Sequence, residues 1–310
     1  MLTDNDLPPG VTRINSSLYQ LYSPPGLPEV DIIFFHGLQV RDYRAAYYDT
    51  WFNGNVCWPQ TFLGEQTLTN ARIFSISYDS SARRTNAEGY GDVYTIAESL
   101  VVDIIDNDEV AMGRRCPVIL VGHSLGGLVI KKFLSMTCEI KCSSNPRDPQ
   151  DREKITRYDN FISQVRGVFY YATPHHGSIL ADRALWIPGN YSQVLQFLKT
   201  LSNDTARLNE QFRKFRTIHN IQAATIAESL PTRWIFAFWG LSPISAIVVP
   251  EASARFDAFE HYTSGIADHI TVCKPPDMID NRFSNLRAFI MRNMPEGQQL
   301  TVAEAEAAIQ

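Results

Sequence analysis

Short, unbroken apolar runs recur along the chain, and stretches whose apolar residues return every three or four positions separate several of them. Unbroken runs rich in β-branched and aromatic residues are typical of strands that are buried on both faces of a parallel sheet. The helical spacing between them is typical of helices that cover such a sheet. The pattern predicts strands at 32–35, 73–77, 118–121, 168–172 and 221–226. We therefore expect an α/β fold with a mostly parallel sheet and helices on both faces.

Helical periodicity predicts helices at 93–105 and 125–136 and a closing amphipathic helix at 283–293. Residues 12–22 have the pattern of edge strands that precede the first parallel strand. Residues 139–159 carry Pro, Asn, Asp and Lys without periodicity, which predicts a surface loop.

The segment 177–218 carries Leu and aromatic residues at roughly helical spacing, between two predicted strands. It lies on the side of the sheet where a helical cap would sit, and two interpretations stay open: a packed helical layer or a mobile lid. No internal repeat or Gly/Ser-rich linker divides the chain. We expect one domain over 1–295, followed by a polar tail at 296–310.

The composition is that of an ordinary globular protein, with 310 residues, 45% hydrophobic and 20% charged. A net charge of −5 favours neither nucleic acid nor an anionic membrane surface as a partner. The five cysteines are scattered and no second Cys or His pair completes a zinc site, so we expect reduced thiols. The composition does not predict an oligomeric state.

No membrane span is predicted. The most apolar segment, 234–250, is short and is interrupted by Gly240 and Pro243. Its aromatic part, 234–239, leaves two interpretations: contact with a membrane surface, or a buried strand and loop. The acidic N-terminus resembles neither a secretory signal nor a transit peptide, so we expect an intracellular, cytoplasmic protein.

A serine stands between a predicted strand and a predicted helix, in the sequence Gly-His-Ser-Leu-Gly-Gly at 122–127. The two glycines that flank this serine, Gly122 and Gly126, let a tight turn close with Ser124 at its apex. The strand before and the helix after make the motif more specific than the five-residue pattern Gly-His-Ser-Leu-Gly alone. We interpret Ser124 as a nucleophile at the N-terminus of a helix.

A serine nucleophile needs a base and an acid, and in this arrangement both follow it along the chain, the histidine last. His269 lies in a short loop before the closing helix, where the base should be, and His261 is its rival. His175 and His176 precede every good acid candidate, which favours substrate-side or structural roles for them.

The acid should follow the next-to-last strand of the sheet. Glu228 stands at the end of the strand 221–226 and is the preferred candidate. Glu251 is the rival and Asp257 a weaker third candidate. Asp268 adjoins His269, and neighbouring residues rarely orient each other in the way that a triad requires.

An oxyanion must also be stabilised, and two backbone N–H groups commonly do so. One is expected from Leu125, directly after the serine, and the other from Leu38, after the first parallel strand, where Gly37 permits a tight turn.

These residues and an ordered series of further segments resemble lipase-type α/β-hydrolases. The resemblance is strongest to the serine active site-containing protein family, linked to phosphatidylglycerol remodelling, and to its plant and fungal relatives. It implies an α/β-hydrolase fold, supports Ser124 and His269 as catalytic and favours Glu228 as the acid. It also implies the mitochondrion or endoplasmic reticulum as alternative locations. The matching segments are 31–38, 58–63, 72–78, 122–131, 172–178, 248–254 and 268–275.

We therefore expect a serine hydrolase that cleaves carboxylic esters through an acyl-enzyme and needs no metal or cofactor. Its expected partner is a small-molecule or lipid acyl ester, and the resemblance favours lipid or long acyl esters. A lipid acyltransferase and an amide or thioester deacylase are alternatives that the same residues could serve. A third alternative is a non-catalytic signalling or binding module that retains the fold.

Overall fold

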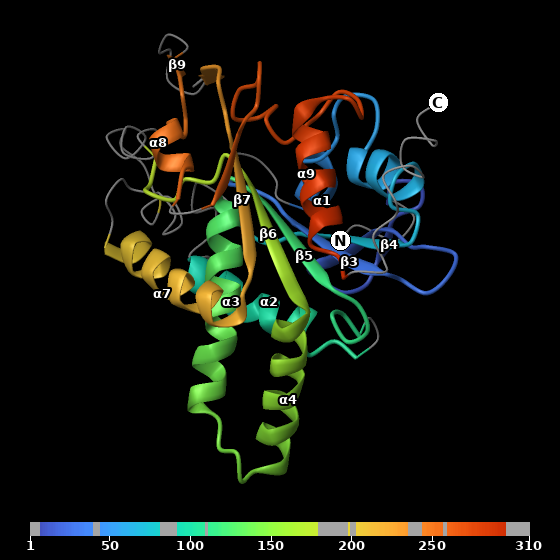
Figure 1. Ribbon diagram of the computed structural model, residues 1–310, viewed down its shortest axis with the longest axis vertical. Helices are drawn as coiled ribbons and strands as arrows, with labels where there is room; N and C mark the ends of the chain where they lie inside the picture. The colour runs from blue at the N-terminus through green and yellow to red at the C-terminus, as the bar shows by residue number, and fades with distance from the viewer. Residues whose placement is uncertain are drawn as a thin grey trace.

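The computed structural model describes residues 7–39, 44–80, 92–108, 111–178, 198, 203–234, 244–256 and 259–295. Among these residues, one eight-stranded sheet is formed by β1 (Thr12–Arg13), β2 (Leu18–Tyr22), β3 (Val30–Phe35), β4 (Ala71–Ile76), β5 (Val118–His123), β6 (Val165–Tyr171), β7 (Gln222–Ala227) and β10 (Glu260–Thr263). Their order in the sheet is β1-β2-β4-β3-β5-β6-β7-β10, and Figure 1 shows the central strands β3 to β7 side by side. All neighbouring pairs from β4 to β10 are parallel, and β1 and β2 form an antiparallel edge.

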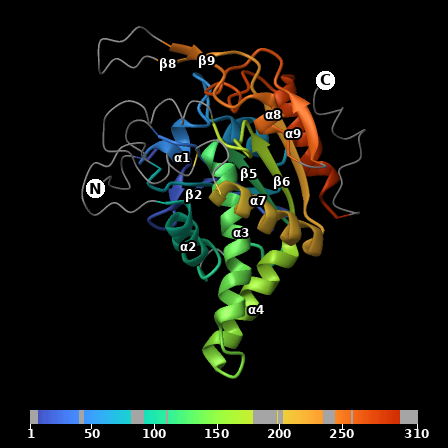
Figure 2. The same cartoon turned by 90° about the vertical axis from the view of Figure 1, so that its left-hand side faces the viewer.

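Helices cover both faces of the sheet. On one face lie α2 (Val93–Ile104), α3 (Leu125–Ser143), α4 (Pro149–Gln164) and α7 (Asn203–His219), and on the other lie α1 (Ala46–Asp49), the π-helical segment η2 (Pro59–Glu65) and α9 (Asn281–Arg292). Figure 2 shows α3 and α4 extending together beyond the end of the sheet. A separate antiparallel pair is formed by β8 (Thr232–Trp234) and β9 (Ile244–Ala246), and the short helix α8 (Glu251–Ala254) follows it.

Successive residues of the central strands belong to two different cores. In β3, Phe35 packs with the residues of α2 and α3, whereas its neighbour Phe34 packs with those of η2 and α9. The two faces alternate because consecutive side chains of a strand point in opposite directions. This two-sided burial is the physical reason why the strands are continuous apolar runs, and it confirms the predicted fold class.

The predicted surface loop at 139–159 is wrong, because α3 continues to Ser143 and α4 begins at Pro149. The Asp148 side chain caps α4 by accepting a hydrogen bond from the Gln150 N–H at 2.9 Å. The apolar residues that anchor α4, among them Phe161, lie in its last turns. Its first turns are polar and exposed, so they show no apolar periodicity.

Part of the segment 177–218 is the helix α7, which packs against α3. Its residues Leu208 and Phe212 are fully buried, and Asn209 accepts a hydrogen bond from Lys131 of α3 at 2.7 Å. This part is a packed helical layer. Residues 179–197 and 199–202 lie outside the described residues, so the lid interpretation stays a prediction for them.

Most of the aromatic segment 234–239 and all of the tail 296–310 also lie outside the described residues. None of the helices in the described part of the chain combines the length and the apolar character needed to cross a bilayer. Both interpretations of the segment 234–239, contact with a membrane surface or a buried strand and loop, stay predictions, and so does the expected cellular location.

Candidate active site

Ser124 occupies a strained turn between β5 and α3. Its φ of 53° and ψ of −123° lie outside the regions that residues with a side chain normally adopt. The turn is packed against the neighbouring strand ends, since a Cβ on Gly126 would lie 2.2 Å from the carbonyl oxygen of Phe35. Glycine is therefore required at 126 for the turn to approach β3. The same turn places Ser124 at the carboxyl edge of the parallel sheet, where α/β proteins bind their ligands.

The structure brings Ser124 and His269 into contact. The Ser124 Oγ and His269 Nε2 atoms are 2.8 Å apart, and both side chains are largely buried. The backbone of His269 is fixed at two points. Its N–H donates to Thr232 Oγ1 at 2.9 Å, and its carbonyl accepts from His123 Nε2 at 2.8 Å.

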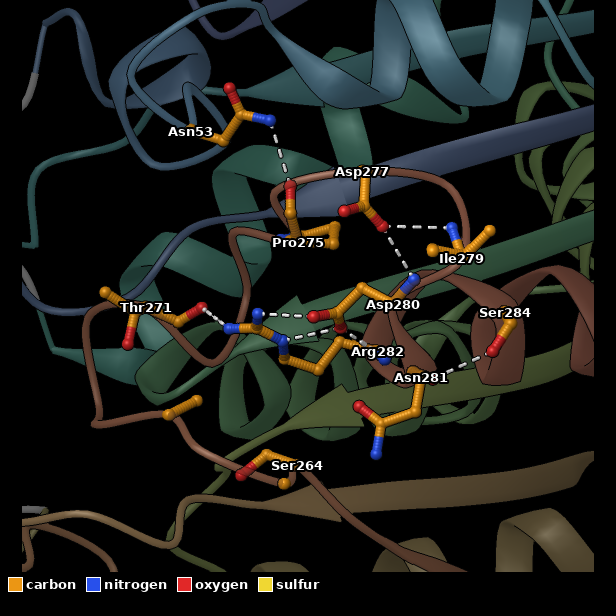
Figure 3. Close-up of polar contacts among 12 residues, drawn as sticks. Asn53, Ser264, Thr271, Pro275, Asp277, Ile279, Asp280, Asn281, Arg282 and Ser284 are labelled. Carbon is orange, nitrogen blue, oxygen red and sulfur yellow. Dashed lines mark hydrogen bonds and ion pairs between the residues drawn. The ribbon is translucent and has the colours of Figure 1, made fainter.

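The chain after His269 is held by charged groups, and Figure 3 shows two of them, Arg282 and Asp280, beside Thr271. Asp268 Oδ1 accepts hydrogen bonds from the N–H groups of Ile270 and Thr271, which closes a turn after the histidine. The buried guanidinium of Arg282, at the start of α9, donates to the Thr271 carbonyl at 2.8 Å and pairs with Asp280. The hydrogen bond to Asp280 raises the pKa of Arg282, so this anchor keeps its charge.

Glu228 follows β7 and reaches the other side of the His269 ring. Its Oε2 atom lies 3.5 Å from His269 Nδ1, and its side chain is fully buried. Its Oε1 atom accepts a hydrogen bond from the backbone N–H of Val249. The structure therefore brings together Ser124, His269 and Glu228, although 145 residues separate the serine from the histidine.

The other acid and base candidates lie elsewhere. Glu251, the first residue of α8, is exposed and pairs with Arg255, which lowers the pKa of Glu251. The rival base His261 lies on β10, with its Nε2 atom 3.3 Å from Glu251 Oε1. The carboxylate of Asp268 caps the turn described above, and Asp257 lies outside the described residues.

Two backbone segments meet at Ser124. A Cβ on Gly37 would lie only 2.9 Å from the Ser124 Cβ, so the loop that carries Leu38 runs directly beside the serine. Leu125 is the first residue of α3, and the first N–H groups of a helix have no partner within it. Both segments are thus near the place where an oxyanion would form.

Besides His269, three histidines of the described residues are buried. Burial lowers the pKa of His36 to about 4 and holds the pKa values of His123 and His175 well below the ordinary value. His36 stacks on Tyr78 with the ring centroids 4.1 Å apart, and His175 lies in an aromatic environment. For His175, the burial agrees with the structural one of the two roles that the sequence favoured. His176 is exposed.

Sequence reasoning did not find the residues that hold the three candidate side chains in place. Thr232, His123 and Arg282 fix the His269 loop, and Val249 donates to Glu228. The sequence did point to the region of Val249, because the segment 248–254 is one of those that resemble lipase-type hydrolases. No group of three or more metal-ligating side chains that could hold a metal ion occurs among the described residues.

The fold matches a solved enzyme structure. The mature form of the Bacillus licheniformis lipase BlEst2 aligns with a TM-score of 0.54 and 19% sequence identity. The alignment covers 88% of this chain and 95% of the lipase. The chain has the α/β-hydrolase fold. The predicted α/β-hydrolase fold is thereby confirmed.

The chain is also similar in sequence to Protein SERAC1. It is 28% identical to the human protein over 267 residues and 25% identical to the Danio rerio protein over 279 residues. Each match covers 80% of this chain but only 36% of the relative, so the chain spans about a third of the length of these curated relatives. No known family profile matches the chain.

Proposed function

We propose that this α/β-hydrolase is a serine hydrolase that cleaves carboxylic esters. The observation that carries the proposal is the contact of His269 with Ser124 on one side and Glu228 on the other, at the carboxyl edge of the sheet. A serine hydroxyl is a poor nucleophile until a base accepts its proton, and His269 Nε2 is within hydrogen-bond distance of it.

In the proposed reaction, His269 Nε2 takes the proton as Ser124 Oγ attacks the acyl carbon. Glu228 stabilises the imidazolium that forms, and its 3.5 Å distance from His269 Nδ1 shortens as that charge develops. His269 then gives the proton to the leaving alcohol, which departs and leaves the acyl group on Ser124. Water, deprotonated by His269, then attacks the acyl carbon. The bond to Ser124 Oγ breaks, Oγ takes the proton back from His269, and the acid is released.

The N–H groups of Leu125 and Leu38 are the proposed oxyanion donors. Leu125 also benefits from its place at the start of α3, because the helix dipole favours negative charge there. Each such donor typically contributes about 3 kcal/mol of transition-state stabilisation. The proposal requires no metal or cofactor, since proton transfer and oxyanion binding suffice for acyl transfer.

For the substrate we propose lipid or other long acyl esters. The fold similarity to the lipase BlEst2 and the sequence similarity to SERAC1 support this choice. A lipid acyltransferase and an amide or thioester deacylase would use the same residues and differ in the acceptor or leaving group. We prefer a serine hydrolase to a non-catalytic module because Ser124, His269 and Glu228 are all present and lie next to one another.

The proposal is tested with p-nitrophenyl esters from acetate to palmitate, with thioester and amide analogues beside them. We expect turnover of esters with kcat/KM rising with acyl length. Ester turnover without that rise would contradict the lipid preference only. A folded protein that hydrolyses none of these substrates would contradict the enzyme proposal.

A further inference from the structure

The peptide unit that joins Val248 and Val249 is hydrogen bonded on both of its edges. The Ser178 hydroxyl donates to the Val248 carbonyl at 2.7 Å, and the Val249 N–H donates to Glu228 Oε1. A peptide unit is planar, so fixing its carbonyl also fixes the direction of its N–H. The Ser178 hydroxyl therefore sets the direction from which Glu228 receives its hydrogen bond.

Ser178 is itself part of a tight contact between two segments, 173–178 and 248–254. The Ser253 hydroxyl donates to the Gly177 carbonyl at 2.6 Å and accepts from the His176 N–H at 3.2 Å, and the Ser253 carbonyl accepts from the His175 N–H at 2.9 Å. We call these bonds, together with that of Ser178, the serine clasp. Both serines are largely buried, with exposed fractions of 4% and 8%.

The clasp is also tied to the strand that carries the acid. Thr225 of β7 donates from Oγ1 to the carbonyl of Ala254 at 3.0 Å. Glu228 follows the same strand, so the segment 248–254 is fixed relative to the base of the Glu228 side chain. The bond from Ser178 to the Val248 carbonyl then restricts the rotation of the peptide unit that joins Val248 and Val249.

We propose that Ser178 is a positioning residue that aims the Glu228 carboxylate at His269. This inference rests on the proposed function, in which Glu228 is the acid. With Oε1 held by Val249, Oε2 faces His269 Nδ1 at 3.5 Å, a distance at which a small rotation of the carboxylate decides whether a hydrogen bond forms. A hydrogen bond to a carboxylate is charge-assisted, and a chain of such bonds strengthens each member.

The test is Ser178→Ala in the full chain, which removes the hydroxyl and little volume. We expect kcat to fall about tenfold, the scale of one well-made hydrogen bond, with KM unchanged. The matched control is Ser135→Ala on α3, another buried serine whose hydroxyl donates to a backbone carbonyl, that of Lys131 at 2.8 Å. This control should keep the kcat of the wild type.

A double-mutant cycle separates positioning from a general structural role. In a Glu228→Ala background there is no carboxylate to aim, so Ser178→Ala should lower kcat no further. If Ser178→Ala does not fold, Ser253→Ala loosens the same clasp and should show a smaller loss of kcat with the same dependence on Glu228.

Two results would overturn the inference while leaving the proposed function in place. One is an unchanged kcat in Ser178→Ala. The other is a loss of kcat on adding Ser178→Ala to Glu228→Ala that is as large as the loss in the wild-type background. A folded wild-type protein without turnover would overturn the proposed function and this inference together.

Discussion

His123 donates from Nε2 to the backbone carbonyl of His269 at a distance of 2.8 Å. A carbonyl can only accept, so the His123 ring must carry its proton on Nε2. Because His123 directly precedes Ser124, this single bond links the turn of the candidate nucleophile to the loop of the candidate base. The two rings lie 5.1 Å apart between centroids.

This bond predicts the effect of two substitutions at 123. Gln can place an amide N–H near the position of the ring Nε2, whereas Leu fills similar space without a donor. We expect His123→Leu to lower kcat/KM at least tenfold and His123→Gln to retain most of it, measured with a p-nitrophenyl ester. Equal losses in the two variants at unchanged melting temperature would show that the donor is not what matters.

If Glu228 is the acid and Glu251 is not, removing the negative charge of each glutamate should have unequal effects on kcat. Glu228→Gln should lower kcat by about 10²–10⁴-fold, because the imidazolium of His269 loses its buried counter-charge. Glu251→Gln weakens the pairs that the exposed Glu251 carboxylate makes with Arg255 and His261, and should leave kcat within about twofold. Steady-state kinetics on both variants decides the matter. A crippled Glu251→Gln beside an active Glu228→Gln would make Glu251 the acid.

The buried histidines predict a loss of stability in acid. Burial holds the pKa of His36 at about 4 and those of His123 and His175 well below 6.5, whereas in the unfolded chain each is near 6.5. Between those values the unfolded chain binds more protons, so the free energy of unfolding falls as pH decreases below about 6.5. Each histidine contributes about 1.4 kcal/mol per pH unit in that window.

Urea unfolding at pH 7.5, 6.0 and 5.0 measures this slope. His175→Leu should reduce it by one histidine's contribution, because both ring nitrogens of His175 are buried without a hydrogen-bond partner among the described residues. A free energy of unfolding that is constant from pH 7.5 to 5.0 would contradict the assigned burial of these rings.

The close approach of the serine turn to β3 predicts that Gly126 tolerates no side chain. A Cβ there would overlap the carbonyl oxygens of Phe35 and His36, so we expect Gly126→Ala to destabilise the fold by about 1–3 kcal/mol or more and to lower activity. The matched control is Gly26→Ala, where a Cβ meets nothing within 4 Å. Thermal unfolding should separate the two. A Gly126→Ala variant as stable as its control would contradict the geometry of the turn.

The five central strands of the sheet, β3 to β7, could be predicted from the sequence because they are largely buried on both faces and so appear as apolar runs. The edge strand β10 was not predicted, because none of its residues is fully buried and it forms no such run. The helix α4 could not be predicted either, since its apolar anchors, such as Phe161, stand at its end while its first turns face solvent. The polar sequence of the first turns of α4 does not show that the apolar residues of its last turns pack against the sheet.

The site could be predicted in part. Ser124 was recognisable from its local turn, and chain order restricted the base to a few histidines. The acid stayed open between Glu228 and Glu251, because both follow apolar runs and only tertiary structure shows which one is buried beside His269. Hydrogen bonds such as that of Ser178 to the Val248 carbonyl join distant segments and leave no periodic signal.

The most direct test of the account is labelling by a fluorophosphonate, which reacts covalently with activated serine nucleophiles. Wild type and Ser124→Ala are compared at equal concentration after circular dichroism shows that both are folded. We expect wild type to be labelled at Ser124, located by peptide mass spectrometry, and Ser124→Ala to be unlabelled. Absence of labelling in folded wild type, or labelling that persists in Ser124→Ala, would contradict the assignment of Ser124 as the activated nucleophile.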